Sequence, residues 1–474
     1  MTVAPAILAT VAVAAIIYHF CYSLFFSSLA RIPGPKSFAW TKLTIHALHA
    51  EYGPVVRVGP SEVTFSSTTA MRSIYGAGSG FERMSFYRMF EAYGRKNMVS
   101  FSTVREHGER KKLFAHSYAK SMMLKGDNAA MVLQKAKLFL DLLAREGPDS
   151  EIFSTLHYFS LDNITEFLYG NFGKTACLEG SKKDRELIGD IVDVARRKLS
   201  WYSVHFPGFT NWFYSRTGVM ACIARQIYPM EAPTAYTARE ASLIAKLWTH
   251  HYSNKEDGLD DLDIASEVKT TPEHHSLAGV DTTSDTLMFL IWSLSRPQNR
   301  VFQGKLIEEV CKIPTECLDA NGIPRPVVCD KLLYVDAVIK ETLRLFAPLP
   351  GSEPRSLSTA TSINGYLIPP QTVVSISPYA LHRNPDIFKD PLKFNPDRWM
   401  DMLKSDEAKK WFWAFSSGGP MCIGMHLAMA EMTTLVVALY RKYTTMTIDG
   451  FDDISPGITA RNMNVESNLP LALE

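Results

Sequence analysis

The segment that decides the fold is Trp413–Ala430, which reads WAFSSGGPMCIGMHLAMA. It carries one cysteine, Cys422, in a glycine-rich loop directly before Met425–Tyr440, a mostly apolar stretch that we expect to be a helix. Gly418 and Gly419 can adopt backbone conformations that other residues resist, so the loop can surround one sulfur with backbone N–H groups. The positive end of the following helix would stabilise a thiolate there. The segment therefore predicts that Cys422 is an anionic ligand.

Two more residues of the loop fit a flat, metal-bearing ring beside the sulfur. Gly424 leaves no side chain where such a ring would lie, and Phe415 can shield the sulfur from water. A thiolate ligand pushes electron density onto heme iron and favours O–O cleavage. Taken alone, however, the loop is also compatible with a structural cysteine in a turn.

Composition narrows the possible classes of protein. The chain has 474 residues, 26 Pro, 27 Gly and a net charge of +1, so it lacks the concentrated basic charge of nucleic-acid-binding proteins. Its seven cysteines are scattered, and an odd number in a chain of this size argues against a disulfide framework. We interpret the six other than Cys422 as free thiols in a reducing compartment. Residues 37–474 contain no linker or repeat and are expected to form one domain.

The N-terminus predicts a membrane anchor. Ala6–Phe26 supplies the roughly 20 apolar residues that a helix needs to cross a bilayer. A cleavable signal peptide and a buried core helix are the alternatives. The signal peptide fits less well because the apolar stretch is too long and no basic residue precedes it. We therefore expect an anchor over residues 1–30 and a proline-rich hinge over residues 31–36. Arg31 and Lys36 then place the following domain in the cytosol.

The pattern of the remaining sequence predicts a mainly α fold with a smaller β portion. Strand-like segments lie toward the two ends of the chain, at Tyr52–Ser66, a hairpin, and at Ser362–Ser377. Helical periodicity marks Ser160–Gly170, Leu277–Leu294 and Leu332–Phe346.

The cysteine segment resembles the signature of the cytochrome P450 family. Phe415, Gly418, Cys422 and Gly424 stand where the family has the same residue types. The resemblance implies that Cys422 is the axial ligand of a heme b iron. One position departs: the family has an arginine that pairs with a heme propionate, and this chain has Pro420, which offers neither the charge nor a backbone N–H.

A second motif is a pair of opposite charges at Glu341 and Arg344 in KETLRLFAPLP, which resembles the E-x-x-R helix of the same family. Such a pair alone is commonly a solvated surface pair. The segment FNPDRW contains Arg398 and resembles the part of the family that joins this pair. The resemblance implies a buried network of Glu341, Arg344 and Arg398 that holds the cysteine loop beneath the heme. Buried charges of this kind must satisfy one another.

The third motif, AGVDTT from Ala278, resembles the oxygen-activation motif of the family's central helix. Ala278 and Gly279 are small and would let the helix pass close over the heme. The Thr282 hydroxyl can donate to the Ala278 carbonyl, and Asp281 and Thr282 are then placed to deliver protons to oxygen. Without the cysteine motif the same residues would indicate a helix cap. Pro272, just upstream, is either a first-turn proline or a kink.

Heme carboxylates need cationic partners, and three residues resemble those of the family. His107 and Lys111 are four residues apart in EHGERKKLFAHSY, and Arg355 lies in GSEPRSL. Each could instead be a half-exposed surface residue. With Pro420 in place of the arginine, these three would carry more of the anchoring.

Taken together, the resemblance implies a single heme-binding domain of the cytochrome P450 fold behind an N-terminal transmembrane helix. It also implies a monooxygenase on the endoplasmic reticulum membrane that uses O2 and takes electrons from a separate NADPH-dependent reductase, since the chain has no flavin domain or dinucleotide motif. GSEPR and SSGGPMCIGMHLAMAEM look closest to microsomal members in filamentous-fungal secondary metabolism. A polyketide, terpenoid or alkaloid intermediate is the expected lipophilic substrate.

Two alternatives stay open at this point. With Pro420 replacing the arginine, the protein could be a heme-poor, inactive relative that acts as a binding or scaffold protein. It could also be a heme-thiolate isomerase or dehydratase that needs no reductase. The second alternative fits less well because Asp281 and Thr282 provide proton delivery that such chemistry does not require.

Overall fold

The computed structural model describes residues 42–90, 96–147, 150–192, 243, 261–402, 409–447 and 470–473. The predicted anchor over residues 1–30 and hinge over residues 31–36 lie outside these ranges. Among the helices that are described, none has the length and apolar character to cross a bilayer. The described part is mainly helical with a smaller share of strands, as the sequence predicts.

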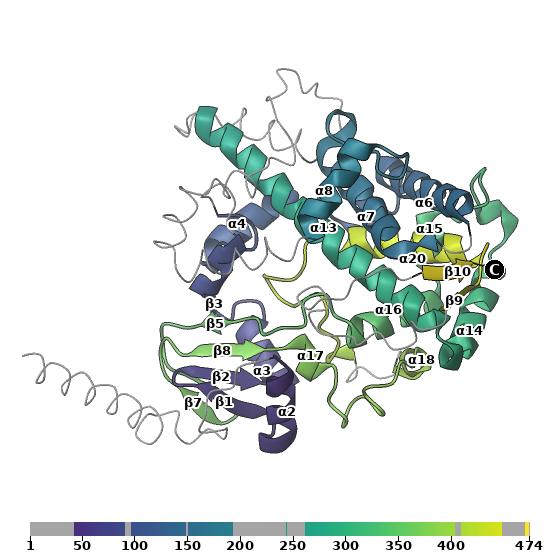
Figure 1. The fold of residues 1–474 in the computed structure, drawn as a ribbon. Helices are drawn as coiled ribbons and strands as arrows, with labels where there is room; N and C mark the ends of the chain where they lie inside the picture. The colour runs from purple at the N-terminus through teal and green to yellow at the C-terminus, as the bar shows by residue number, and fades with distance from the viewer. Residues whose placement is uncertain are drawn as a thin grey trace, which may run out of the picture.

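A five-stranded sheet stands apart from most of the helices, at the lower left of Figure 1. Its strands follow the order β1 (Val55–Gly59), β2 (Glu62–Phe65), β8 (Val373–Ile376), β5 (Arg355–Ser356) and β3 (Glu82–Arg83). β1 and β2 form the predicted hairpin, whereas β2 and β8 pair in parallel although they are far apart in the chain. The sheet therefore joins the N-terminal part of the domain to its later part.

The second predicted strand region forms three strands. β6 (Thr361–Ile363) and β7 (Tyr366–Ile368) make a separate hairpin, and β8 follows. Asn364 and Gly365 join the hairpin with φ values of 49° and 81°. Positive φ at both central residues is the geometry of a tight two-residue hairpin, which Asn-Gly favours. A three-stranded sheet of β4 (Ser150–Glu151), β10 (Pro470–Leu473) and β9 (Thr445–Thr447) lies at the other side of the molecule, at the right of Figure 1.

The helices form the rest of the described domain. Near the large sheet are α2 (Lys42–Tyr52), α3 (Thr68–Tyr75) and α17 (Pro378–Leu381), and elsewhere are α4 (Val104–Ala115), α5 (Lys120–Met123), α6 (Gly126–Glu146), α7 (Ile152–Tyr169), α8 (Lys182–Val192), α13 (Asp261–Ser295), α14 (Arg300–Cys311), α15 (Pro326–Cys329), α16 (Leu333–Leu345), α18 (Asp397–Met402) and α20 (Met425–Tyr440). The long helix α13 crosses the middle of the molecule (Figure 1).

The predicted helices are confirmed with small changes of extent. α16 covers the predicted Leu332–Phe346 to within one residue at each end, and α20 has the predicted bounds. The segment Ser160–Gly170 is the second half of α7, which ends at Gly170 with φ of 63°. α13 begins at Asp261, so Pro272 lies inside the helix and is not a first-turn proline.

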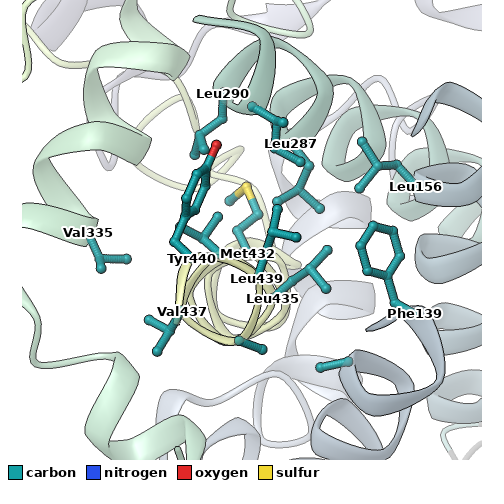
Figure 2. Packing of buried hydrophobic residues seen from close by; sticks show 14 of the residues in the cluster. Phe139, Leu156, Leu287, Leu290, Val335, Met432, Leu435, Val437, Leu439 and Tyr440 are labelled. Atoms are coloured by element: carbon teal, nitrogen blue, oxygen red, sulfur yellow. The ribbon is translucent and has the colours of Figure 1, made fainter. Parts of the chain in front are cut away.

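The main core surrounds α20. This helix carries buried side chains around its circumference, as expected for a helix enclosed by others. Figure 2 shows Leu435 and Leu439 of α20 in the middle of the cluster, with Leu287 of α13 on one side and Phe139 of α6 and Leu156 of α7 on another. Because α20 follows Cys422 directly, packing of this helix in the core fixes the position of the cysteine.

Candidate heme-thiolate site

The three charged residues that the sequence places in one network lie together. Arg344 donates from Nε and Nη2 to the two carboxylate oxygens of Glu341, at 2.8 Å each, and Arg398 Nε donates to Glu341 Oε1 at 3.1 Å. The Glu341 and Arg344 side chains have no solvent exposure. Trp399 Nε1 and the Asn395 N–H also donate to this carboxylate, at 2.9 and 2.8 Å. Glu341 is thus a fully paired buried anion.

The same network reaches the cysteine loop through His382. Arg344 Nη1 donates to the His382 carbonyl at 3.0 Å, and the His382 Nε2 accepts the N–H of Trp413 at 2.9 Å. Burial and the neighbouring arginines lower the pKa of His382 to about 3, so its ring is neutral and Nε2 can accept. Trp413 Nε1 in turn donates to Ser417 at 3.0 Å. The charged network therefore orients the first residues of the loop.

Gly418 is needed in this loop for two reasons. Its backbone has a positive φ, and it lies close to the backbone of Tyr75. Gly418 has φ of 63°, and a Cβ added there would overlap the Tyr75 carbonyl oxygen. In this loop Gly418 and Ser416 have positive φ values, and Gly419 does not. Of the two glycines that the sequence singles out for their conformational freedom, Gly418 uses it in this structure.

Cys422 lies where the loop enters α20. Its N–H donates to the Phe415 carbonyl at 2.9 Å, so Phe415 holds the loop through its backbone, while its ring packs against the main core. Burial raises the pKa of the Cys422 thiol, and N–H bonds from Gly424 and Met425 act against this shift. The side chain nevertheless remains exposed to solvent.

Lys111 of α4 contacts the loop directly. Its Nζ donates to the carbonyl oxygens of Gly419 and Met421, at 2.8 and 2.6 Å. These two residues flank Pro420, and the positive charge of Lys111 also acts against the rise in the pKa of Cys422 that burial causes. In the structure Lys111 contacts the loop backbone. Its predicted role as a partner of a heme carboxylate stays a prediction.

The other residues proposed for carboxylate binding lie in a group of cations. His107 of α4 is buried, and burial together with Arg83, Lys111 and Arg355 lowers its pKa to about 3. Arg355 donates to Tyr87 and to Glu353 Oε2. His107 is therefore neutral among these neighbours and can offer an N–H donor but no charge.

The oxygen-activation motif adopts the hydrogen bond that its spacing predicts. Thr282 Oγ1 donates to the Ala278 carbonyl at 2.7 Å, and Ala278 is exposed. Gly279, unlike the exposed Ala278, lies close to a neighbouring helix. A Cβ added at Gly279 would lie 2.9 Å from Cγ1 of Ile164 in α7. This glycine lets α13 pack closely against α7. Val280 shares a buried cluster with Leu427 of α20, which brings this motif near the cysteine helix.

Glu431 of α20 was not predicted from the sequence. Its side chain is buried, and burial raises its pKa well above the usual range, with a hydrogen bond to Thr283 of α13 as the opposing influence. Burial therefore favours the protonated form of Glu431, and its hydrogen bond with Thr283 links the cysteine helix to the oxygen-activation motif.

We expect Glu431→Gln to stabilise the protein at neutral pH. A carboxyl with a raised folded-state pKa contributes stability that is complete below its unfolded pKa and is lost as pH rises toward the folded pKa. This loss amounts to about 1.4 kcal/mol per unit between the two pKa values. Glutamine keeps the hydrogen-bonding shape without titrating. Thermal unfolding at pH 5 and pH 8 should show the advantage of the variant growing with pH.

Glu308→Gln is the matched control for that experiment. Lys312 lowers the pKa of Glu308, which is exposed on α14, so its substitution should give a small loss of stability at neutral pH. Equal pH dependence of the wild type and Glu431→Gln would show that Glu431 is ionised in the fold.

Other residues of the site also escaped prediction. Arg83, Tyr87 and His382 stand in segments with no recognisable motif, and their role depends on partners distant in the chain. Trp399, in contrast, could have been predicted from the sequence. It follows Arg398 in the segment FNPDRW, and a buried indole N–H usually donates a hydrogen bond.

The donor set fits a heme. Cys422 is exposed, its sulfur receives two backbone N–H bonds, and Gly424 adds no side chain beside it. On the carboxylate side, Arg83 and Arg355 lie together and the Nε of Arg83 is buried without a partner. A planar ring with an iron and two carboxylates matches these groups.

Comparison with known proteins agrees with this geometry. The family model "Cytochrome P450" matches residues 39–458. The chain is 29% identical to "Cytochrome P450 monooxygenase stcB" of Emericella nidulans, over 88% of this chain and 82% of that protein. It is 27% identical to "Cytochrome P450 monooxygenase tazI" of Aspergillus terreus, over 91% of each chain. It is also 27% identical to "Tryprostatin B 6-hydroxylase" of Aspergillus fumigatus, over 86% of this chain and 71% of the relative. A family match over most of the chain, together with the cysteine loop, shows that the protein is a member of the cytochrome P450 family.

Proposed function

We propose that this protein is a monooxygenase that inserts one oxygen atom from O2 into a small lipophilic intermediate of fungal secondary metabolism. The observation that carries the proposal is the Cys422 sulfur, which accepts N–H bonds at the start of α20 in a chain of this family. One similar protein is named as a tryprostatin B 6-hydroxylase, which supports hydroxylation as the class of reaction.

The family implies heme, which when bound supplies the oxidising chemistry. Cys422 would supply the sulfur that holds the iron, and the N–H groups of Gly424 and Met425 would stabilise its negative charge. The core packing of α20 and the network around Glu341 keep this ligand at a fixed place. Rigid positioning matters because a flexible thiolate would be protonated or displaced by water.

Proton delivery is assigned to Thr282 and Asp281. The Thr282 hydroxyl donates to the Ala278 carbonyl and is partly exposed, so it can exchange this bond for one to water or to the oxygen being reduced. Asp281 is the adjacent residue on α13 and can restore the proton. The proposal therefore gives the motif a catalytic role that a helix cap would not have.

Electrons are proposed to come from NADPH through a separate reductase at the endoplasmic reticulum membrane. Support comes from the apolar segment Ala6–Phe26 and from Arg31 and Lys36 beside it. Residues 1–30 would anchor the chain, residues 31–36 would form the hinge, and residues 37–474 would face the cytosol. A lipophilic polyketide, terpenoid or alkaloid could then reach the protein from the lipid.

We expect Thr282→Ala to separate NADPH consumption from product formation. Loss of the hydroxyl removes the final proton donor, and positioned acids of this kind contribute about 100-fold or more to proton transfer. Since water can substitute in part, product per NADPH should fall roughly tenfold while NADPH consumption changes less. The measurement uses the purified protein, its reductase and a substrate identified by metabolite profiling of a deletion strain.

Thr286→Ala is the control, because Thr286 Oγ1 makes the same type of bond one turn later, to the Thr282 carbonyl at 2.7 Å, and is buried. Full coupling in Thr282→Ala would remove Thr282 from the mechanism. Turnover of the wild-type protein without NADPH would instead favour an isomerase or dehydratase.

A further inference from the structure

Glu353, which lies just before β5, contacts the cysteine loop with its side chain. Its Oε2 accepts a hydrogen bond from Ser416 Oγ at 3.2 Å and lies 3.3 Å from Nη2 of Arg355. Its backbone is also held on both sides, because its N–H donates to the Ile376 carbonyl at 3.1 Å and its carbonyl accepts from the Tyr75 hydroxyl. The sheet and the loop together therefore fix the position of this carboxylate.

The contact with Ser416 lies next to the backbone that places Cys422. Ser416 has φ of 59°, a conformation that residues other than glycine rarely adopt. The carbonyl of Phe415, the residue before it, accepts the Cys422 N–H at 2.9 Å. Glu353 therefore supports a strained residue of the loop and brings its charge to the part of the loop that holds Cys422.

Lys111 and Glu353 act on the Cys422 sulfur with opposite signs. Burial raises the pKa of the Cys422 thiol, the charge of Lys111 acts against this rise, and the charge of Glu353 adds to it. The Lys111 ammonium is held at the loop by the carbonyls of Gly419 and Met421, at 2.8 and 2.6 Å. Both charges are thus tied to the loop that carries the sulfur.

The surroundings of Glu353 support its ionised form. Burial raises the pKa of its carboxyl, while Arg355, Ser416 and Arg83 act in the opposite direction. Its side chain is 20% exposed, so water also stabilises the charge. The reduction potential of a bound heme would reflect these charges together with the thiolate and the two heme carboxylates. A substitution that neutralises Glu353 changes one charge in that sum.

We propose that Glu353 lowers the reduction potential of the iron bound at Cys422 and that Lys111 raises it. A negative charge near the sulfur disfavours the electron that reduces the iron, and a positive charge favours it. Because hydrogen bonds tie both side chains to the loop, the two charges act from fixed places. The inference rests on heme binding through Cys422 in the proposed function but not on oxidation of a substrate.

The test is a redox titration of the purified holoprotein at pH 8, where a carboxyl with a raised pKa is more fully ionised. Heme absorbance gives the ratio of ferrous to ferric protein at each applied potential. Glu353→Gln keeps an acceptor oxygen for Ser416 and should raise this ratio roughly tenfold, the order expected for one partly screened unit charge. The midpoint potential then rises by about 59 mV, the tenfold value for a one-electron couple.

Lys111→Gln should change the potential in the other direction. Loss of its positive charge should lower the ratio of ferrous to ferric protein by a similar factor. Lys111→Arg and Glu353→Asp keep the charges and should stay close to the wild type. Opposite shifts in the two neutral variants are the signature of charge, because general damage to the loop gives no reason for a change of sign. A lowered or unchanged potential in Glu353→Gln would overturn the proposal.

Ser416→Ala is the matched control. It removes the hydroxyl that donates to Glu353 and leaves the carboxylate in place. Its potential should therefore shift much less than that of Glu353→Gln. If both variants shift the potential equally, the effect comes from a change in the loop and the proposal is overturned.

This readout needs neither a substrate nor a reductase. A protein that shows the two opposite shifts but oxidises nothing would contradict the proposed function and leave the roles of Glu353 and Lys111 intact. An active monooxygenase whose potential does not respond to Glu353→Gln would contradict the role of Glu353 and leave the proposed function intact.

Discussion

Glu341→Gln is expected to lower the free energy of unfolding by about 3–5 kcal/mol, the usual result when one partner of a buried ion pair is removed. Glu341 accepts from Arg344, Arg398 and Trp399 in a place without solvent. Glutamine has one acceptor oxygen, and its amide nitrogen would face donors, so two buried arginines would lose their counter-charge. Because domains are stable by only about 5–15 kcal/mol, this loss would leave a large unfolded fraction.

Urea denaturation followed by tryptophan fluorescence measures this effect. The control is Asp336→Asn on the same helix, where Asp336 pairs with Lys340 at 2.6 Å with about a third of each side chain exposed. Partly exposed pairs contribute about 1 kcal/mol or less, so this variant should unfold close to the wild type. A similar small change in both variants would mean that the Glu341 network is not essential to the fold.

The second large effect is expected for Cys422→Ser, which should abolish monooxygenation and the absorption band that thiolate ligation gives to reduced, carbon-monoxide-bound heme. Serine is similar in size and can accept the same N–H bonds, so the loop should fold as before. Its hydroxyl, however, stays protonated at neutral pH and cannot donate charge to iron as a thiolate does. The variant therefore separates the fold of the loop from its chemistry.

Cys311→Ser is the control for this substitution. Cys311 is an exposed thiol at the end of α14, and its replacement should leave the spectrum and the activity unchanged. A Cys422→Ser protein that kept the thiolate band would show that another sulfur holds the iron. Absence of heme from the wild-type protein would instead favour a scaffold role.

Local sequence patterns were sufficient for most of the fold. The period of apolar residues predicted α16 and α20 almost to the residue, whereas the hairpin at Asn364-Gly365 was recognised only in the structure. α13 was predicted too short, since its first turns carry polar residues and a proline that local rules interpret as a break. In the folded protein α13 nevertheless continues through Pro272, so its packing in the tertiary structure outweighs this local preference.

The sequence by itself identified the family, through short motifs that each span a few positions, and predicted the hydrogen bond between Thr282 and Ala278, because these residues are one helical turn apart. The contacts of Gly279, Gly418, Lys111 and Arg83 were decided only by the tertiary structure. Lys111 and Met421, for example, are 310 residues apart in the chain. No local pattern encodes such a pair, since it forms only after the helices and the sheet have packed around a common core.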